Sequence, residues 1–519
     1  MKRIIGRILI VLPAIALQVG FYVVIYMLLN RVLDGRLSSI ITAVFTLLGL
    51  FFVIHIVNKR DESAYKLLWT IVLLLLPVLG AMMYLTLGNK KTGKKLKRSL
   101  QQSSKDLLAD SFSGSAAEIE SRHAAVIGKI REEEPRIAQT LNHVMESTHF
   151  PILVNGTSKY YQFGELGFAD MCEDLKTAEK YVYLEYFIIE SGKFWDTLVD
   201  LLAERASAGV DVRVMYDDFG SLSTYSRKDI KYLATRGIKC IAFNPFFLIK
   251  SQLNNRDHRK IMVIDGRIAY SGGINLADEY INETHPFGKW KDLCFRLTGP
   301  AVRSYTYMFA EFWDAFSNDK IPQELLREAE FEEAHDENNG YILPYYDSPM
   351  RNEPTSNTLF TEMLSMATEY VWFYTPYLML GDTLFDAFIR AARRGIDVRI
   401  ITPAIPDQKM VHRIGRSHYG DLIQAGVKIY EYTPGFVHAK AVLMDGKLAG
   451  IGTVNLDYRS LFLHFECYSV FYKSNMVDDL KNDYEETLKD CHQITFEEVQ
   501  FGVMHRLGDS LLRVIAPLM

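Results

Sequence analysis

Cysteine is scarce in this sequence and forms no pattern. The 519 residues include five cysteines, which are Cys172, Cys240, Cys294, Cys467 and Cys491. Their number is odd, they are widely spaced, and they form no C-x-x-C pair, so the sequence predicts neither a disulfide framework nor a zinc site. We expect buried, reduced thiols, which are typical of a domain in the cytosol.

The sequence also lacks an excess of positive charge. There are 58 Lys and Arg against 63 Asp and Glu, a net charge of −5, which argues against a nucleic-acid-binding surface. Basic residues gather only in KKTGKKLKR (90–98). The overlapping GNKKTGKK (88–95) resembles a P-loop but has Lys95 where Ser or Thr would bind magnesium. A basic strip that holds anionic lipid headgroups is the better interpretation.

Long apolar runs fill the N-terminal region. Ile8–Leu29, Leu37–Val57 and Tyr65–Leu87 each have about 21–23 residues, enough to cross the ~30 Å hydrocarbon core of a bilayer. The first run follows basic residues, as a signal peptide does, but it is too long and no A-x-A cleavage site follows it. We therefore predict that residues 1–90 form a retained transmembrane region, with spans at about 8–29, 37–57 and 65–87.

The signals for membrane orientation conflict. The basic cluster after the third run favours a cytosolic location for the rest of the chain. Three spans would then place Lys2 and Arg3 outside, against the same rule. Either the denser cluster sets the orientation or the first run does not fully cross. We expect a multi-pass protein of the bacterial cell membrane, with its large domain in the cytoplasm.

The rest of the chain contains an internal repeat. The aligned pairs are YVYLEYFII (181–189) with YVWFYTPYL (370–378), AGVDVRVMYDD (208–218) with RGIDVRIITPA (394–404), and RGIKCIAFNP (236–245) with AGVKIYEYTP (425–434). Each copy reads as strand, amphipathic helix, strand, helix, strand and a further strand. This alternation predicts an α/β sheet covered by helices, with two halves related by pseudo-two-fold symmetry.

The predicted domain organisation follows from this repeat. Residues 136–325 form the first repeat and residues 326–500 the second. Residues 91–135 read as a charged linker with short helices that spaces the repeats from the bilayer. Residues 501–519 read as an amphipathic C-terminal segment, for which docking onto the domain is favoured over membrane insertion.

One short motif occurs once in each repeat. HRKIMVID carries His258, Lys260 and Asp265, and HAKAVLMD carries His438, Lys440 and Asp445. Both have the form H-x-K-x4-D, and both precede a turn of small residues that ends in Asn. The turn residues are Gly273 and Asn275 in the first copy and Thr453 and Asn455 in the second. Residues two apart on a strand share a face, so each imidazole lies beside a fixed positive charge that suits phosphate chemistry.

These motifs resemble those of the phospholipase D superfamily. The stretches NNRDHRK, GGINLADEY, YTPYL, GFVHAK and NLDYRSLFLHFE are similar to bacterial cardiolipin synthases in particular. The resemblance runs from about Val154 to the C-terminus and includes the hydrophobic N-terminus. It implies that the two motifs meet at the symmetry axis in one active site.

The resemblance also implies roles for individual residues. His258 would be the nucleophile that forms a phospho-histidine, and His438 the general acid and base. Lys260 and Lys440 would neutralise phosphate oxygens, while Asn275, Asn455 and the turns at Gly273 and Thr453 would donate N–H groups. Asp292 and Glu466 would orient the two imidazoles. Asp265 and Asp445 complete the motif, although in this superfamily they look structural. No metal or other cofactor is indicated.

The implied reaction converts two phosphatidylglycerols into cardiolipin and glycerol. The open alternatives are a phospholipase D-type hydrolase, with water as acceptor, and another phosphatidyltransferase such as a phosphatidylserine synthase. We expect phosphatidylglycerol and anionic membrane lipid as partners, and no nucleic acid. The first repeat carries nine more residues than the second before its His (189 minus 180), within FFLIKSQLNNRD (246–257). We expect the apolar part of this insertion to exclude water.

Overall fold

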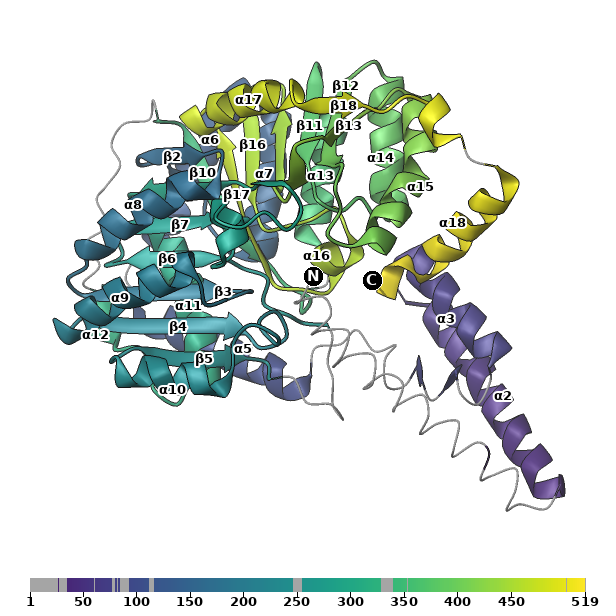
Figure 1. The fold of residues 1–519 in the computed structure, drawn as a ribbon, viewed down its shortest axis with the longest axis horizontal. Helices are drawn as coiled ribbons and strands as arrows, with labels where there is room; N and C mark the ends of the chain where they lie inside the picture. The colour runs from purple at the N-terminus through teal and green to yellow at the C-terminus, as the bar shows by residue number, and fades with distance from the viewer. Residues whose placement is uncertain are drawn as a thin grey trace.

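A computed structural model describes residues 27, 35–59, 61–76, 80–81, 83–84, 93–111, 116–245, 254–327, 339–351, 353–500 and 502–518. Two α/β units lie side by side, and an arm of helices from both ends of the chain projects from them (Figure 1). The apolar insertion at 246–253 lies outside the described residues.

The first repeat contains a seven-stranded sheet in the order β2-β9-β7-β6-β3-β4-β5. Its strands are β2 (Ser158–Tyr161), β3 (Tyr181–Tyr186), β4 (Asp211–Asp217), β5 (Lys239–Phe243), β6 (Ile261–Ile264), β7 (Ile268–Gly272) and β9 (Cys294–Thr298). Its helices are α8 (Gly164–Lys176), α9 (Lys193–Ser207), α10 (Arg227–Thr235), η1 (Asp278–Ile281), α11 (Val302–Phe316) and α12 (Gln323–Arg327). Strands β3, β4 and β5 run parallel, and β6 pairs antiparallel with β3.

The second repeat has the same arrangement in a nine-stranded sheet, β1-β10-β17-β16-β15-β11-β12-β13-β18. Its strands are β1 (Leu153–Val154), β10 (Tyr341–Asp347), β11 (Tyr370–Tyr374), β12 (Asp397–Pro403), β13 (Lys428–Tyr432), β15 (Ala441–Met444), β16 (Leu448–Gly452), β17 (Glu466–Tyr472) and β18 (Cys491–Gln493). Its helices are α13 (Thr355–Met366), α14 (Asp382–Arg393), α15 (Lys409–Ala425), α16 (Tyr458–Phe462), α17 (Asn475–Leu488) and η3 (Glu497–Val499).

The predicted strand and helix order is confirmed in both repeats. Strands β3, β4 and β5 correspond to β11, β12 and β13, and β15 pairs antiparallel with β11 as β6 does with β3. Helices α9 and α14 end just before Gly209 and Gly395, whose φ angles are +94° and +90°. Glycine adopts this left-handed conformation without a Cβ clash, so it ends each helix and turns the chain into the next strand.

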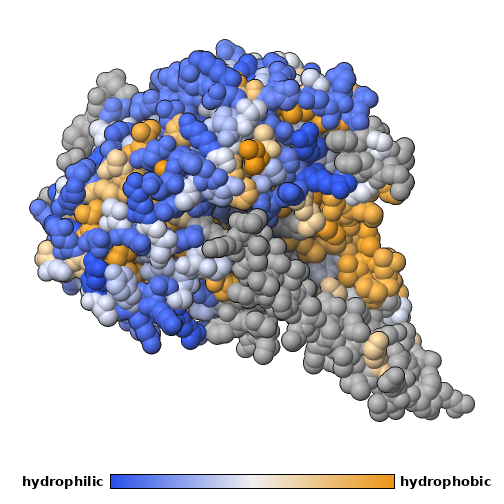
Figure 2. Space-filling view, viewed as in Figure 1, coloured by the Kyte–Doolittle hydropathy of each residue, from blue (hydrophilic) through white to orange (hydrophobic). Residues whose placement is uncertain are grey.

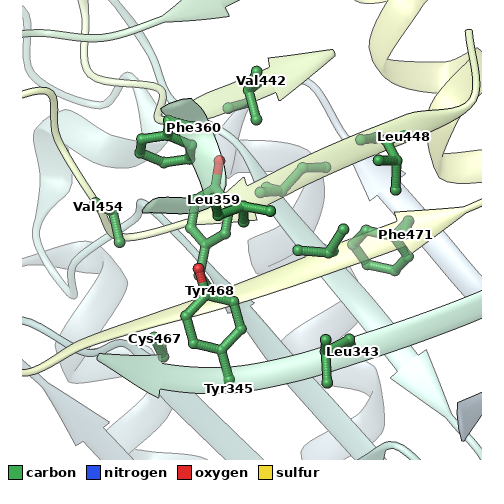
Figure 3. Packing of buried hydrophobic residues seen from close by; sticks show 14 of the residues in the cluster. Leu343, Tyr345, Leu359, Phe360, Val442, Leu448, Val454, Cys467, Tyr468 and Phe471 are labelled. Carbon is green, nitrogen blue, oxygen red and sulfur yellow. The ribbon is translucent and has the colours of Figure 1, made fainter. Parts of the chain in front are cut away.

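One continuous hydrophobic core joins the repeats. It contains the inner faces of the second sheet, helix α11 and part of the first sheet. Figure 3 shows part of this core within the second repeat, where Phe360 of α13 lies against Tyr468 of β17, with ring centroids 5.5 Å apart. Between the repeats, the ring centroids of Phe295 of β9 and Phe471 of β17 are 5.5 Å apart. Packing of this kind fixes the two sheets relative to each other and therefore the position of anything held between them.

The interpretation of residues 91–135 as a polar spacer is wrong for the part that the structure describes. These residues form α5 (Lys94–Ser111) and α6 (Ala116–Glu133), followed by α7 (Pro135–Thr148). Leu100 and Leu107 of α5 are almost fully buried in the shared core, and Ser103 Oγ donates to the carbonyl of Glu311 at 2.8 Å. Most residues of α5 are polar, so its narrow stripe of leucines was not recognised in the sequence.

The start of the first repeat also differs from the predicted one. Strand β1 pairs with β10 of the second sheet, while β2, a few residues later, pairs with β9 of the first. Helix α7 likewise packs against α13. The chain therefore contributes α7 and β1 to the second unit before it forms β2 of the first. A boundary at residue 136 assigns these two elements to the wrong repeat.

The predicted membrane spans are only partly covered by the described residues. Helices α2 (Gly35–Val57) and α3 (Ser63–Leu75) occupy the second run and the start of the third. Helix α3 ends at Leu75, two residues before Pro77, because proline disfavours a helical conformation in the residue before it. Apart from Met27, the run Ile8–Leu29 lies outside the described residues. Across the described ranges, no helix combines the length and the apolar stretch that crossing a bilayer needs.

Candidate active site

Each His-x-Lys pair lies at a junction between two short extended segments. His258 and Lys260 directly precede β6, and His438 and Lys440 directly precede β15. On its other side each pair continues from a segment that bonds to the opposite repeat. Strand β14 (Gly435–Val437) pairs in parallel with β8 (Lys289–Lys291), and Asp257 forms an isolated parallel bridge with Phe465.

This crossing brings each histidine to a carboxylate of the other repeat. His258 Nδ1 lies 2.8 Å from Glu466 Oε2, and His438 Nδ1 lies 2.6 Å from Asp292 Oδ2. The backbone follows the same pattern, because the N–H of His258 donates to Phe465 O and that of His438 to Lys291 O. Neither repeat alone can therefore hold its own imidazole, and the two motifs form one site.

The site buries several ionisable groups together. Burial, reinforced by Lys260 and Lys440, lowers the pKa of both His258 and His438 well below the usual range. Burial also raises the pKa of Glu466 to about 8 and that of Asp292 to about 6. A neutral imidazole with Nδ1–H directed at a carboxylate leaves the Nε2 lone pair free, which is the state that a nucleophile or a base requires.

The two lysines are buried and place positive charge where little water surrounds it. Burial lowers the pKa of Lys260 to about 8 and that of Lys440 to about 7. Lys260 Nζ donates to the carbonyl of His258 at 2.6 Å, and Lys440 Nζ lies 2.7 Å from His438 Nδ1. An incoming phosphate anion would favour the charged form of both lysines.

Asp265 and Asp445 lie at the opposite ends of β6 and β15 from the histidines. The Asp265 carboxylate accepts the backbone N–H groups of residues 179–181, and Asp445 accepts those of residues 368–370, at 2.8–2.9 Å. They pin the starts of β3 and β11. These contacts agree with the structural role that the resemblance implies for them, although they are part of the motif.

The turns after the motifs are bonded differently from the expectation. The backbone N–H of Gly273 donates to Leu293 O and that of Thr453 to Cys467 O, so these groups do not point at a phosphate. A Cβ at position 273 would lie 2.1 Å from Asp292 Oδ1, so only glycine leaves room for this carboxylate. Thr453 Oγ1 instead donates to Glu466 Oε2 at 2.5 Å. Both turn residues therefore support the orienting carboxylates.

The two asparagines are not equivalent. Asn275 Oδ1 accepts the N–H of Ile188 at 3.0 Å, and its Nδ2 donates to Tyr280 Oη at 2.6 Å. The Asn455 side chain instead hydrogen-bonds the Asp457 carboxylate, and its Oδ1 is buried without a partner among the described residues. Of these two asparagines, only Asn455 thus leaves its amide oxygen without a hydrogen-bond partner among the described residues.

Aromatic rings that the sequence analysis missed surround the imidazoles. The ring of Phe187 lies edge-on to His258, with centroids 4.9 Å apart. Tyr280 and Trp290 each lie 5.4 Å from the His438 ring. Phe187 directly follows β3, and Tyr280 comes five residues after Asn275. Both positions therefore lie close in sequence to features that the sequence does predict. The rings exclude water from the histidines.

A buried ionic network was also missed. Arg259 is fully buried and donates from Nε to Asp257 Oδ1 at 3.0 Å and from Nη2 to Glu185. Its guanidinium lies over the Phe312 ring, 3.5 Å from the centroid. The second repeat has Tyr374, Val437 and Ala439 at the corresponding positions. The network therefore holds the segment that carries His258 and has no counterpart beside His438.

We expect Glu185→Ala to destabilise the protein by about 3–5 kcal/mol, because it leaves part of the buried Arg259 charge uncompensated. Thermal unfolding of the purified chain measures the loss. Glu283→Ala, which breaks an exposed pair with Lys193, is the matched control and should change little. Equal unfolding temperatures for the two variants would contradict the prediction.

Within the part of the chain that the structure describes, no three His, Cys, Asp or Glu side chains are grouped so that they could hold a metal ion.

The fold has a solved relative of the same architecture. The crystal structure of phosphatidylserine synthase from Haemophilus influenzae Rd KW20 matches with a TM-score of 0.57 over 73% of this chain and 100% of that chain, at 12% identity. The profile described as "Cardiolipin synthase, PLD-like domain" matches residues 171–287 and 360–488, one segment in each repeat. A second profile, "Phospholipase_D-nuclease N-terminal", matches residues 47–89. Fold and paired motifs thus define a two-repeat enzyme of the phospholipase D superfamily.

Similar sequences show to which family of this superfamily the chain belongs. The cardiolipin synthase of Oceanobacillus iheyensis is 31% identical over 91% of this chain and 99% of its own length. That of Alkalihalophilus pseudofirmus is 30% identical over 94% of this chain and 95% of its own length. A Streptococcus mutans protein without a functional name is 37% identical over 90% and 99%. The chain belongs to the cardiolipin synthase family.

Proposed function

We infer that this chain is a cardiolipin synthase, a phosphatidyltransferase that converts two phosphatidylglycerols into cardiolipin and glycerol. The observation that carries this conclusion is the crosswise pairing of His258 with Glu466 and of His438 with Asp292. It gives one site two oriented imidazoles, one to act as the nucleophile and one as the general acid and base of a double displacement.

In the first step, His258 Nε2 attacks the phosphorus of one phosphatidylglycerol. A P–N bond forms and the bond from phosphorus to the headgroup glycerol oxygen breaks. His438, which must enter this step protonated on Nε2 and is favoured in that form by the bound phosphate anion, gives this proton to the departing oxygen. Lys260 and Lys440 balance the negative charge on the non-bridging oxygens. Glycerol leaves and a phosphatidyl-histidine remains.

In the second step, a headgroup hydroxyl of another phosphatidylglycerol replaces the departed glycerol. His438 now accepts the hydroxyl proton, the oxygen attacks phosphorus, and the P–N bond breaks. Cardiolipin forms and His258 returns to its starting state. One phosphodiester replaces another, so no nucleotide is needed to drive the exchange.

The products from phosphatidylglycerol alone test this function. Purified full-length protein in vesicles of phosphatidylglycerol should release free glycerol and cardiolipin in roughly equal amounts. A phospholipase D would give mainly phosphatidic acid, and a phosphatidylserine synthase would need serine and a different donor. Dominant phosphatidic acid in membranes rich in phosphatidylglycerol would refute the transferase assignment.

The low lysine pKa values predict a fall in kcat/KM as pH rises through about 7–8. Burial lowers the pKa of Lys440 to about 7 and that of Lys260 to about 8 in the free enzyme. A lysine is charged only below its pKa, and a phosphodiester stays a monoanion throughout, so substrate loses its counter-charge on the alkaline side. Bound substrate should raise the pKa of both lysines, so kcat should fall at a higher pH than kcat/KM does. A kcat/KM that is flat to pH 9 would contradict this.

We also propose that the enzyme is a multi-pass protein of the bacterial cell membrane with its catalytic domain in the cytoplasm. The exposed apolar side chains of α2 and the basic cluster at 90–98 support this. A membrane-impermeant thiol reagent should leave the partly exposed Cys172, Cys240 and Cys491 unmodified in intact cells and label them after permeabilisation. Labelling in intact cells would reverse the orientation.

A further inference from the structure

The C-terminal helix α18 (Val503–Ile515) turns charged side chains toward the catalytic body. Arg413 of α15 donates from Nε to Asp509 Oδ1 at 2.8 Å, and Arg513 donates from Nε to Ser417 Oγ at 2.9 Å. Asp509 is buried in this contact. These bonds fix the rotation of α18 about its axis, and they confirm that the segment docks onto the domain.

The opposite side of α18 carries exposed leucines. Leu507 and Leu511 are one helical turn apart and are 57% and 65% exposed. A helix docked on a domain in water normally directs its charges outward and its apolar stripe inward. Here the buried Asp509 and the partly exposed Arg513 face the protein, whereas Leu507 and Leu511 face away, which suits an apolar medium on the outer side.

This outer side continues onto the N-terminal helices. Helix α18 packs against α3, and Leu512 shares a hydrophobic cluster with Ala64 of α3 and Tyr458 of α16. Helix α3 exposes Leu67, and α2 exposes leucine, isoleucine and phenylalanine side chains along its length. Figure 2 shows a hydrophobic patch where α3 and α18 leave the catalytic body.

The end of α18 is also tied to the active-site segment. After the turn η4 (Ala516–Leu518), the carbonyl of Leu518 accepts a hydrogen bond from Arg459 Nη2 at 2.7 Å. Arg459 lies on α16, in the segment that runs from Asn455 to Glu466. The position of α18 therefore sets the position of the loop that carries half of the site.

We propose that the leucine face of α18 rests in the boundary between headgroups and acyl chains of the bilayer, and that α18 and α3 together hold the active site at headgroup height. The proposal rests on the proposed function, because only a lipid substrate gives this placement a use. Lipid is the occupant because the leucine face continues the apolar surface of α2 and α3. Amphipathic helices bind such boundaries through their apolar face.

The test compares bilayer and monomeric substrate in the full-length protein. The double variant Leu507→Glu/Leu511→Glu should lose at least about 10-fold in turnover on phosphatidylglycerol vesicles. On dihexanoyl phosphatidylglycerol below its critical micelle concentration, it should keep wild-type turnover within about 2-fold. Leu166→Glu, at a 48% exposed leucine of α8, is the matched control and should match wild type on both substrates.

A second measurement does not depend on turnover. A fluorophore on Leu511→Cys should be quenched by lipids brominated in the acyl chains, whereas one on Leu166→Cys should not, with the unsubstituted protein giving the background from native cysteines. Equal quenching at the two sites, or equal loss on both substrates, would overturn the proposal. A change in oligomeric state of the double variant in detergent would assign the face to a second copy instead. If wild type makes only phosphatidic acid, the proposed function fails, but the vesicle-to-monomer ratio still decides the role of α18.

Discussion

His258→Ala is expected to abolish cardiolipin formation, with a loss of about 10⁴-fold or more in turnover. The imidazole supplies both the nucleophile and the leaving group of the two displacements, and among the described residues His258 is the only histidine that hydrogen-bonds Glu466. The trapped phosphatidyl adduct should disappear as well. Liquid chromatography with mass spectrometry measures the product and the adduct together.

The variant His438→Ala distinguishes the role of His438 from that of His258. It should slow turnover on phosphatidylglycerol about as strongly, because the glycerol oxygen then leaves without a proton. With a p-nitrophenyl phosphodiester, whose leaving group needs no proton, this variant should still form an adduct at His258. An adduct mapped to position 438 in the His258→Ala protein would reverse the assignment.

The duplicated motif and its repeat could be predicted from sequence because both leave local signals. Matched spacing between H-x-K-x4-D and the following turn marks the site, and hydrophobic periodicity marks β3, α9, β4 and their partners in the second repeat. These features depend on residues a few positions apart. They appear in one chain without any knowledge of how its halves meet.

The crosswise pairing could not be predicted in this way. Asp292 and Glu466 were selected by resemblance, and nothing in their spacing said which histidine each one contacts. The pairing arises because β8 and β14 form a two-stranded sheet between repeats, which is a contact over more than 140 residues of chain. The network of Glu185, Asp257 and Arg259 was not predicted for a related reason. Charged residues are usually solvated, and the sequence does not show that these three are buried.

The interpretation of α5 failed because its composition was read as a whole. KKLKRSLQQSSKDLLADS is mostly polar, yet Leu96, Leu100 and Leu107 fall on one side and enter the shared core. A helix needs only a narrow apolar stripe to dock. The end of α3 at Leu75 is a similar case, because the proline at 77 limits a run that hydropathy alone treats as continuous.

Glu466→Gln and Asp292→Asn should each reduce turnover on phosphatidylglycerol by about 10²–10⁴-fold, because an amide can hold the imidazole in the wrong tautomer. Neutral Gln and Asn keep the size of the side chain, so the effect reports charge and proton placement rather than a cavity. Circular dichroism and unfolding temperatures close to wild type would serve as the control for folding.

The two variants should nevertheless respond in opposite ways to the leaving group, and this follows only from the crossing of the repeats. Asp292 lies on His438, so Asp292→Asn impairs proton donation and should regain much of its rate of adduct formation with a p-nitrophenyl phosphodiester. Glu466 lies on His258, so Glu466→Gln impairs the nucleophile itself and should regain little. Rapid-quench measurement of the adduct distinguishes them. Rescue of Glu466→Gln but not of Asp292→Asn would mean that the roles of the two histidines are exchanged, while equal rescue would mean that the carboxylates act on both.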